Sequence, residues 1–228
     1  MSGEIVRFAA DNTNSGLFLQ GIIRIPENPL GIVIFVHGSG SSKKSTRNQA
    51  ISEKLYENKI GTFLFDLLSE EEQRSDMQIE KIITQIPGAV LNKFNITLLT
   101  RRLFTATEWI MNHQQKNNLE LSYFASSTGA AAALVASTKF HIRSIIIRSG
   151  RTDLVTKDIF PKIISPCLFI AGDGEKIAIK IAKQTLKKLT NVREKNLSVI
   201  KNASHLLEES GSIERVALLA VTWIQNHS

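Results

Sequence analysis

Short apolar segments alternate with longer amphipathic or polar segments along most of the chain. The apolar segments lie at 31–36, 62–67, 119–124, 142–147, 167–171 and 197–200. Several are apolar on both faces, which is typical of strands inside a covered parallel sheet. The stretches between them are long enough for crossover helices with right-handed connections. The pattern predicts an α/β fold, with a mostly parallel sheet and helices on both faces.

The two ends and one middle segment add to this picture. Two strand-like segments at 4–8 and 17–25 precede the alternation and predict an antiparallel hairpin at the edge of the sheet. Apolar residues gather on one side of 212–227, which predicts an amphipathic helix. The least regular segment, 69–95, is interpreted either as a lid over a site or as a surface excursion. We expect one domain for the whole chain, 1–228.

The composition is that of an ordinary globular protein. Hydrophobic residues make up 43% and charged residues 21%, which argues against extensive disorder. No apolar segment is long enough to span a bilayer, and the first residues lack the apolar core of a secretory signal. We therefore expect a cytoplasmic protein with no membrane partner. The single cysteine, Cys167, lies within an apolar segment, so we expect a buried core thiol.

The chain is basic, with 28 Lys and Arg against 21 Asp and Glu and a net charge of +7. Part of the excess is a set of lysines, Lys176, Lys180, Lys183 and Lys187, whose spacing places them on one face of a helix. We interpret this face as solvated, because no aromatic or glycine pattern of a nucleic-acid module accompanies it. We expect no nucleic-acid partner.

A serine lies between the strand expected at 119–124 and an alanine-rich stretch. The sequence there is Ala125-Ser126-Ser127-Thr128-Gly129. A nucleophile elbow of the Gly-x-Ser-x-Gly type needs small residues two positions before and two after the nucleophile, because strand and helix backbones pass close together. Ala125 stands where the first glycine is usual. The alternative interpretation is an ordinary serine cap at a helix start.

A glycine-containing loop, His37-Gly38-Ser39-Gly40, follows the strand expected at 31–36. In an α/β-hydrolase such a loop supplies one oxyanion donor, and the residue after the nucleophile supplies the other. The expected donors are the N–H groups of Ser39 and Thr128. A phosphate loop or a dinucleotide fingerprint would need glycine at position 43, which is a lysine here.

A histidine, His205, follows the last expected strand. In α/β-hydrolases the triad members occur in the order serine, acid, histidine, and His205 comes last as required. The joint order of glycine loop, serine turn and histidine predicts a serine hydrolase. Ser127 is the expected nucleophile and His205 the expected general base, with an acyl-enzyme as intermediate.

Several stretches carry a family resemblance, and they span nearly the whole chain. They are 37–42, 47–48, 65–68, 126–131, 148–154 and 203–209. In these stretches the sequence resembles the dienelactone hydrolase family of α/β-hydrolases, in a bacterial branch whose nucleophile is serine. The resemblance implies the α/β-hydrolase fold and hydrolysis of a small-molecule substrate. In dienelactone hydrolase itself the nucleophile is a cysteine, whereas Cys167 lies away from the elbow here.

The acid of the triad is the least certain assignment from the sequence. Relatives resemble Gly-Gly-x-Asp after the strand expected at 167–171, which would put the acid at Gly174. This chain has carboxylates on either side of that position. We expect Asp173 to be the acid, because the neighbouring glycines give its loop freedom to aim a short side chain. Glu175 and Asp153 are the alternatives.

The displaced acid supports a second hypothesis. A catalytically impaired α/β-hydrolase homologue could keep the fold and act as a binding protein. Gly174 favours this hypothesis, and the presence of both Ser127 and His205 opposes it. Under either hypothesis we expect no metal or organic cofactor, because acyl transfer needs none and no cysteine and histidine cluster is present in the sequence.

Overall fold

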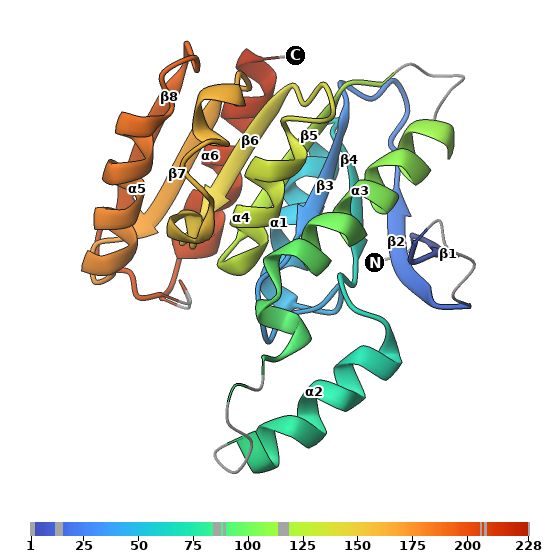
Figure 1. The fold of residues 1–228 in the computed structure, drawn as a ribbon. Coiled ribbons are helices and arrows are strands. Elements are labelled where there is room, and N and C mark those ends of the chain that lie inside the picture. Colours follow the sequence, from blue (N-terminus) through green and yellow to red (C-terminus); the bar gives the residue numbers. More distant parts are fainter. Residues whose placement is uncertain are drawn as a thin grey trace.

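The computed structural model describes residues 3–11, 16–83, 88, 90–113, 119–205, 207 and 209–227. Its centre is an eight-stranded sheet in the order β1-β2-β4-β3-β5-β6-β7-β8 (Figure 1). The strands are β1 Glu4–Ala9, β2 Phe18–Arg24, β3 Ile32–Val36, β4 Gly61–Phe65, β5 Leu121–Ser126, β6 Ser144–Arg148, β7 Cys167–Gly172 and β8 Lys195–Ile200. Strands β3 to β8 are parallel, and β2 runs antiparallel to both β1 and β4. The predicted parallel sheet with an antiparallel N-terminal hairpin is confirmed.

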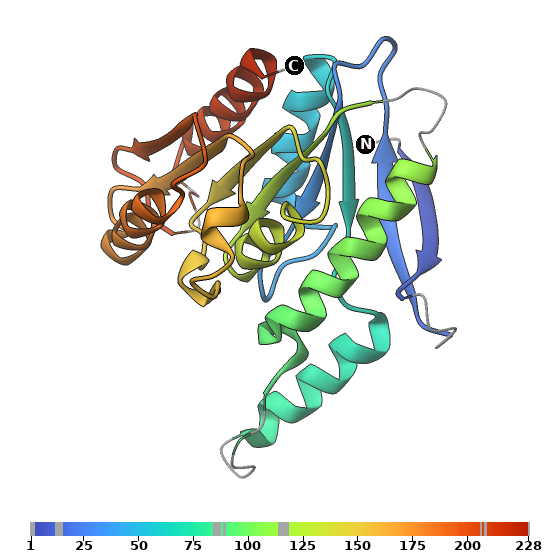
Figure 2. The same cartoon turned by 45° about the horizontal axis from the view of Figure 1, so that its top comes forward.

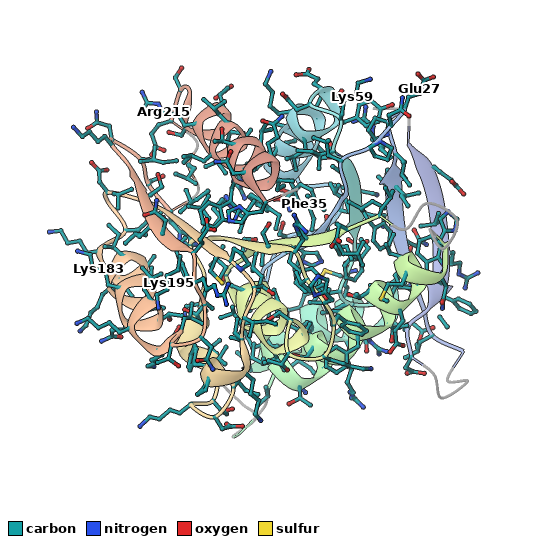
Figure 3. All side chains as sticks on the ribbon, turned by 90° about the horizontal axis from the view of Figure 1, so that it is seen from above. Glu27, Phe35, Lys59, Lys183, Lys195 and Arg215 are labelled. Atoms are coloured by element: carbon teal, nitrogen blue, oxygen red, sulfur yellow. The ribbon has the colours of Figure 1, made fainter. Side chains whose placement is uncertain are left out.

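Helices cover both faces of the sheet (Figures 2 and 3). Two of them, α1 Thr46–Glu57 and α6 Ser212–Asn226, pack together on one face. The other face carries α3 Ile96–His113, α4 Thr128–Ala136 and α5 Lys176–Lys188. Short 3-10 turns are η2 Asn92–Phe94, η3 Thr152–Leu154 and η4 Phe160–Lys162. Within the described ranges, no helix has both the length and the apolar character of a membrane span.

The alternation of side chains along each strand divides the core into two clusters. On β3, for example, Ile32 and Ile34 pack toward α3 and α4, whereas Val33 and Phe35 pack toward α1 and α6. Every residue of this strand is buried. Burial on both faces explains why the central strands read as continuous apolar segments in the sequence.

One helix stands apart from these layers. Helix α2, Glu70–Ile82, projects beyond the carboxyl end of β4 (Figure 1). It begins with a capping box, in which Ser69 and Glu72 each bond the other's backbone N–H, and Asp76 is its only buried residue. The segment 69–95 thus contains a regular helix, which the Ser-x-x-Glu spacing signals. Residues 84–87 and 89 of that segment lie outside the described residues.

The position of Cys167 leads to a first prediction. The thiol is fully buried at the start of β7 and donates to the Ser165 carbonyl, and burial raises the pKa of Cys167 to about 12. A buried, protonated thiol is inert toward alkylation. We expect iodoacetamide to leave the native protein unmodified and fully active, and to label Cys167 once the protein is denatured. Stoichiometric labelling of the native protein with loss of activity, measured by mass spectrometry, would contradict this and favour a cysteine mechanism.

Candidate active site

Ser127 occupies the sharp turn between β5 and α4. Its backbone lies at φ 48° and ψ −126°, a conformation that L-residues rarely adopt. The turn directs the chain from the carboxyl end of a central strand straight into a helix, so the side chain lies at the edge of the sheet. This strained geometry is what a nucleophile elbow requires, and a simple serine cap does not need it.

The residues around this turn have no room for larger side chains. A Cβ at Gly129 would lie 2.3 Å from the Val36 carbonyl oxygen, and a Cβ at Gly38 would lie 2.5 Å from Ser127 Cβ. Ala125 is completely buried, and the structure accommodates its methyl group in the core. The requirement for a small residue is therefore strict at position 129, and alanine meets it at position 125.

His205 lies in the loop after β8 and is paired with a carboxylate. Its Nδ1 donates to Glu175 Oε1, and the other carboxylate oxygen of Glu175 accepts from Ser149 Oγ at 2.7 Å and from the Gly172 N–H at 2.9 Å. The Glu175 side chain is 5% exposed, whereas that of His205 is 61% exposed. With Nδ1 as the donor, the imidazole keeps Nε2 as its acceptor, as a general base must.

The expectation that Asp173 contacts the histidine is wrong. Its carboxylate accepts the backbone N–H groups of Asn202 at 2.9 Å and Ala203 at 3.1 Å, and these bonds lower the pKa of Asp173. Asp153 does not reach His205 either, because it forms a bidentate pair with Arg151 that lowers the pKa of Asp153. The structure places the alternative, Glu175, beside His205.

A glycine contact explains why the carboxylate that meets His205 is at position 175 and not at position 173. A Cβ at Gly172 would lie 2.2 Å from the Ala203 carbonyl oxygen, so the loops after β7 and β8 pass in direct contact. That close approach brings Asp173 onto the backbone of the histidine loop. Glu175, at the start of α5, faces the interior and has the extra methylene to reach the imidazole.

The two residues expected to supply the oxyanion donors, Ser39 and Thr128, contact each other beside Ser127, and one of the two N–H groups is occupied. The Ser39 N–H donates to Thr128 Oγ1 at 3.1 Å. Thr128 is the first residue of α4, so its own N–H has no acceptor within the helix. An oxyanion held by both N–H groups would share the Ser39 donor with the Thr128 hydroxyl or displace it.

Two residues that support Glu175 were not assigned a role from the sequence. Ser149, at φ 48°, donates its hydroxyl to Glu175. Arg148 is 8% exposed, and in the described structure its Nε and Nη1 have no hydrogen-bond partner. Burial and the charge of Arg47 lower the pKa of Arg148 to about 10, while attraction to Glu175 opposes that shift. Both residues belong to the stretch 148–154. The positive φ of Ser149, directly after β6, cannot be predicted from the sequence.

Ser127, Thr128, Glu175 and His205 all line one cleft of about 640 Å³. Among the described residues no hydrogen bond joins Ser127 Oγ to His205, and such bonds are often long in the absence of substrate. The first turns of α5 form one wall, through Lys176, Ile177, Ala178 and Ile181. Lys176 is exposed, as expected for a solvated lysine face, but it also lines the cleft.

The other lysines of α5 are expected to be dispensable. Lys180 and Lys183 are exposed and do not line the cleft. We expect the double change Lys180→Gln and Lys183→Gln to alter kcat/KM for an uncharged ester by less than about tenfold, or ~1.4 kcal/mol. Steady-state assays of this variant beside Lys176→Gln would measure the difference. A larger loss in the double variant would show that this outer face also contacts the substrate.

The described residues contain no group of three or more His, Cys, Asp and Glu side chains that could hold a metal ion. His37, the first residue of the glycine loop, has a structural role. Its Nε2 accepts the Leu67 N–H at 3.0 Å, its Nδ1 donates to the Gly38 carbonyl at 2.9 Å, and burial lowers its pKa. His37 thus fixes the shape of the loop that carries Ser39.

Comparison with solved structures finds the same fold throughout. A dienelactone hydrolase from Anabaena variabilis is 33% identical, with a TM-score of 0.83 and 98% of each chain covered. Est1E from Butyrivibrio proteoclasticus has a TM-score of 0.73 over 99% of each chain, but its 13% identity supports the fold alone. The esterase PF2001 from Pyrococcus furiosus is similar at a TM-score of 0.77 and 11% identity, covering 99% of this chain and 91% of its own.

Sequence comparison finds two relatives that are not named as hydrolases. No family model matches the chain. Two proteins from strains of Mycobacterium tuberculosis, provisionally named phosphoribosyl transferases, are each 36% identical over 211 residues. The match covers 92% of this chain but 44% of each relative, so the chain spans less than half of their length.

Proposed function

The chain belongs to the dienelactone hydrolase family of α/β-hydrolases, and on that basis we propose that it is a serine hydrolase that cleaves a small-molecule ester. The observation that carries this proposal is the pairing of His205 Nδ1 with the buried Glu175 carboxylate in the same cleft as the strained Ser127. A binding protein has no need for a histidine held in one tautomer beside such a serine. The pairing supports the catalytic hypothesis over the impaired one.

In the proposed reaction, Ser127 Oγ attacks the ester carbonyl carbon while His205 Nε2 takes the hydroxyl proton. Glu175 holds Nδ1–H and stabilises the imidazolium that forms. The N–H groups of Thr128 and Ser39 hold the oxyanion. When the carbon–oxygen bond breaks, His205 gives the proton to the departing alcohol. Water, activated by His205, then hydrolyses the acyl-enzyme and restores the serine.

The name of the mycobacterial relatives does not change this proposal. More than half of each relative lies outside the match, and the matched part corresponds to nearly the whole sheet described above. We propose that the phosphoribosyl transferase name refers to the part of those proteins that lies outside the match. The cytoplasmic location and a small-molecule partner remain predictions from the sequence.

Hydrolysis of p-nitrophenyl acetate tests the proposed function. We expect sustained turnover, and intact-mass analysis of acid-quenched samples should show one acetyl group on the protein. A correctly folded protein that neither hydrolyses activated esters nor becomes acetylated would instead support the catalytically impaired binding protein.

A further inference from the structure

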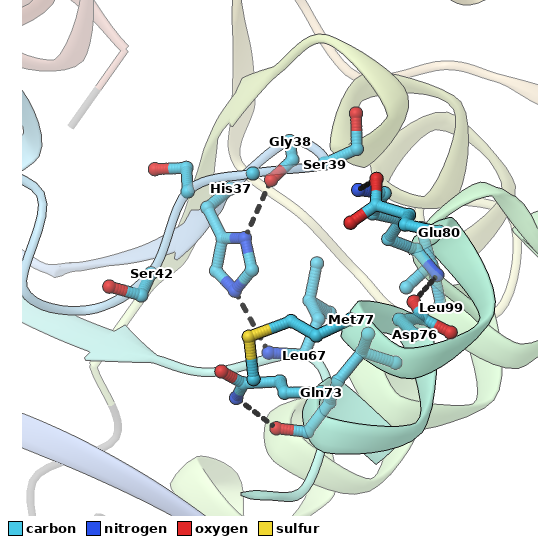
Figure 4. Close-up of a pocket in the computed structure, with 14 residues that line it drawn as sticks. His37, Gly38, Ser39, Ser42, Leu67, Gln73, Asp76, Met77, Glu80 and Leu99 are labelled. Atoms are coloured by element: carbon cyan, nitrogen blue, oxygen red, sulfur yellow. Dashed lines mark hydrogen bonds and ion pairs between the residues drawn. The ribbon is translucent and has the colours of Figure 1, made fainter. Parts of the chain in front are cut away.

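A second cavity, of about 340 Å³, lies next to the cleft that holds Ser127. Its walls come from the glycine loop after β3, the end of β4 and helix α2 (Figure 4). Figure 4 shows the Met77 side chain extending from α2 toward His37 on the opposite wall. Met77 is 55% exposed, so this wall has apolar surface that a bound group would cover.

The cavity reaches the nucleophile through the glycine loop. Gly38 lines the cavity and packs on Ser127, because a Cβ at Gly38 would lie 2.5 Å from Ser127 Cβ and 3.3 Å from its Oγ. Ser39 lines both spaces. The turn η2 separates them further out, with Lys93 facing the cavity and Phe94 facing the cleft. A substrate carbonyl at Ser127 therefore has one space on each side of the oxyanion loop.

We propose that this second cavity binds the acyl part of the substrate, while the cleft with His205 receives the departing alcohol. This inference rests on the proposed serine hydrolase function. His205 must protonate the alcohol oxygen, so that oxygen has to lie on the histidine side of the carbonyl carbon. His205 lines the cleft and does not line the cavity. The acyl chain, which needs no proton, is left with the space beyond Ser39.

The walls of the cavity select an uncharged acyl chain. Apolar contacts come from Leu67, Leu68, Met77 and Leu99, and uncharged polar side chains line the rest of the cavity, namely Ser39, Ser41, Ser42 and Gln73. The ionisable side chains are Asp76, Glu80 and Lys93, and Lys93 is already paired with Glu80. His37 uses both ring nitrogens for backbone contacts, so it offers no further charge or donor. The ionisable side chains that line the cavity therefore carry one uncompensated negative charge. This charge disfavours an acyl group that ends in a carboxylate. The substrate class is an ester of a neutral, mainly apolar acid.

Helix α2 is suited to act as the outer wall of an acyl site. Asp76 accepts the N–H groups of Asn92 at 2.8 Å and Lys93 at 2.9 Å, which attaches α2 to the η2 turn between the two spaces. No other residue of this helix is buried. Few apolar contacts hold α2 to the sheet, so an acyl chain can gain contact with it without displacing a packed core.

A series of p-nitrophenyl esters from acetate to octanoate tests the proposal. We expect the wild type to prefer octanoate over acetate in kcat/KM by at least about tenfold, because each added methylene is buried against the apolar wall. Met77→Trp and Ser42→Trp fill the cavity from opposite sides, and each should lower the octanoate-to-acetate ratio by about tenfold. Met111→Trp, an exposed methionine on α3, is the matched control and should leave both rates unchanged.

Two further comparisons make the outcome decisive. Ile177→Trp alters the cleft with His205 and should keep the wild-type octanoate-to-acetate ratio. The p-nitrophenyl half-ester of octanedioic acid, which adds a terminal carboxylate, should be hydrolysed at least about tenfold more slowly than octanoate. A ratio unchanged in both cavity variants, or lowered only by Ile177→Trp, would overturn the acyl-site assignment while acetate hydrolysis still supports the hydrolase. Loss of all hydrolysis in the wild type would overturn both.

Discussion

Replacing Ser127 with alanine is expected to lower ester turnover by roughly a million-fold, the loss seen when a serine hydrolase loses its nucleophile. The hydroxyl that attacks the carbonyl would be absent, while the oxyanion donors and the cleft would remain. Melting temperature should change little, because alanine has the same backbone requirements as serine at φ 48°. Steady-state assays together with thermal unfolding measure both quantities.

The neighbouring serine provides the matched control for this experiment. Ser126 is the last residue of β5 and is 6% exposed, and we assign it no role in the reaction. Ser126→Ala should retain most of the wild-type activity. If Ser126→Ala were inactive and Ser127→Ala active in folded proteins, the nucleophile would be misassigned.

Changing Glu175 to glutamine is expected to lower kcat by about four orders of magnitude. If the amide oxygen faces Ser149 and Gly172, the amide N–H faces Nδ1 and favours the wrong tautomer of His205. If the amide is flipped, its NH2 group faces the Ser149 hydroxyl and the Gly172 N–H, which are both donors to the carboxylate of the wild type. In both orientations the imidazolium loses its counter-charge. The pH-independent kcat on p-nitrophenyl acetate measures the loss.

Asp173→Asn is the control that separates the two carboxylates of this loop. The asparagine oxygen can still accept one of the two N–H groups that Asp173 holds, so the His205 loop should stay near its present position. We expect less than about tenfold change in kcat/KM. Near-full activity of Glu175→Gln, with a severe loss in Asp173→Asn, would restore Asp173 as the triad acid.

The sequence was sufficient to predict the architecture, because burial on both faces makes the central strands continuously apolar. Element boundaries were less accurate. The strand expected at 119–124 is observed at Leu121–Ser126, since the small residues Ala125 and Ser126 still pair with β6. The pattern of apolar positions does not predict helix α2, because the helix packs little on the core and lacks a clear apolar face. Its capping box is nevertheless visible in the sequence as Ser69 and Glu72.

The strained turn at Ser127 and the loop position of His205 were predictable because their signals are local, namely small residues around Ser127 and the position of His205 after the last strand. The carboxylate that pairs with His205 was not predictable, because the pairing depends on how two loops meet in space. From the sequence alone, Gly172 is expected to give the loop of Asp173 conformational freedom. In the structure it has an ordinary negative φ and is required by contact with Ala203. Such a contact is between residues far apart in the chain, so no local pattern reports it.

Covalent labelling with a fluorophosphonate probe would identify the nucleophile directly, because a serine that a base activates reacts far faster than an ordinary serine. After digestion of the labelled native protein, mass spectrometry identifies the modified residue. We expect one phosphonyl group per chain, located on Ser127 and absent from the Ser127→Ala variant. Modification of Ser126 instead, or no modification of a folded protein, would contradict the assignment of this chain as a serine hydrolase with Ser127 as its nucleophile.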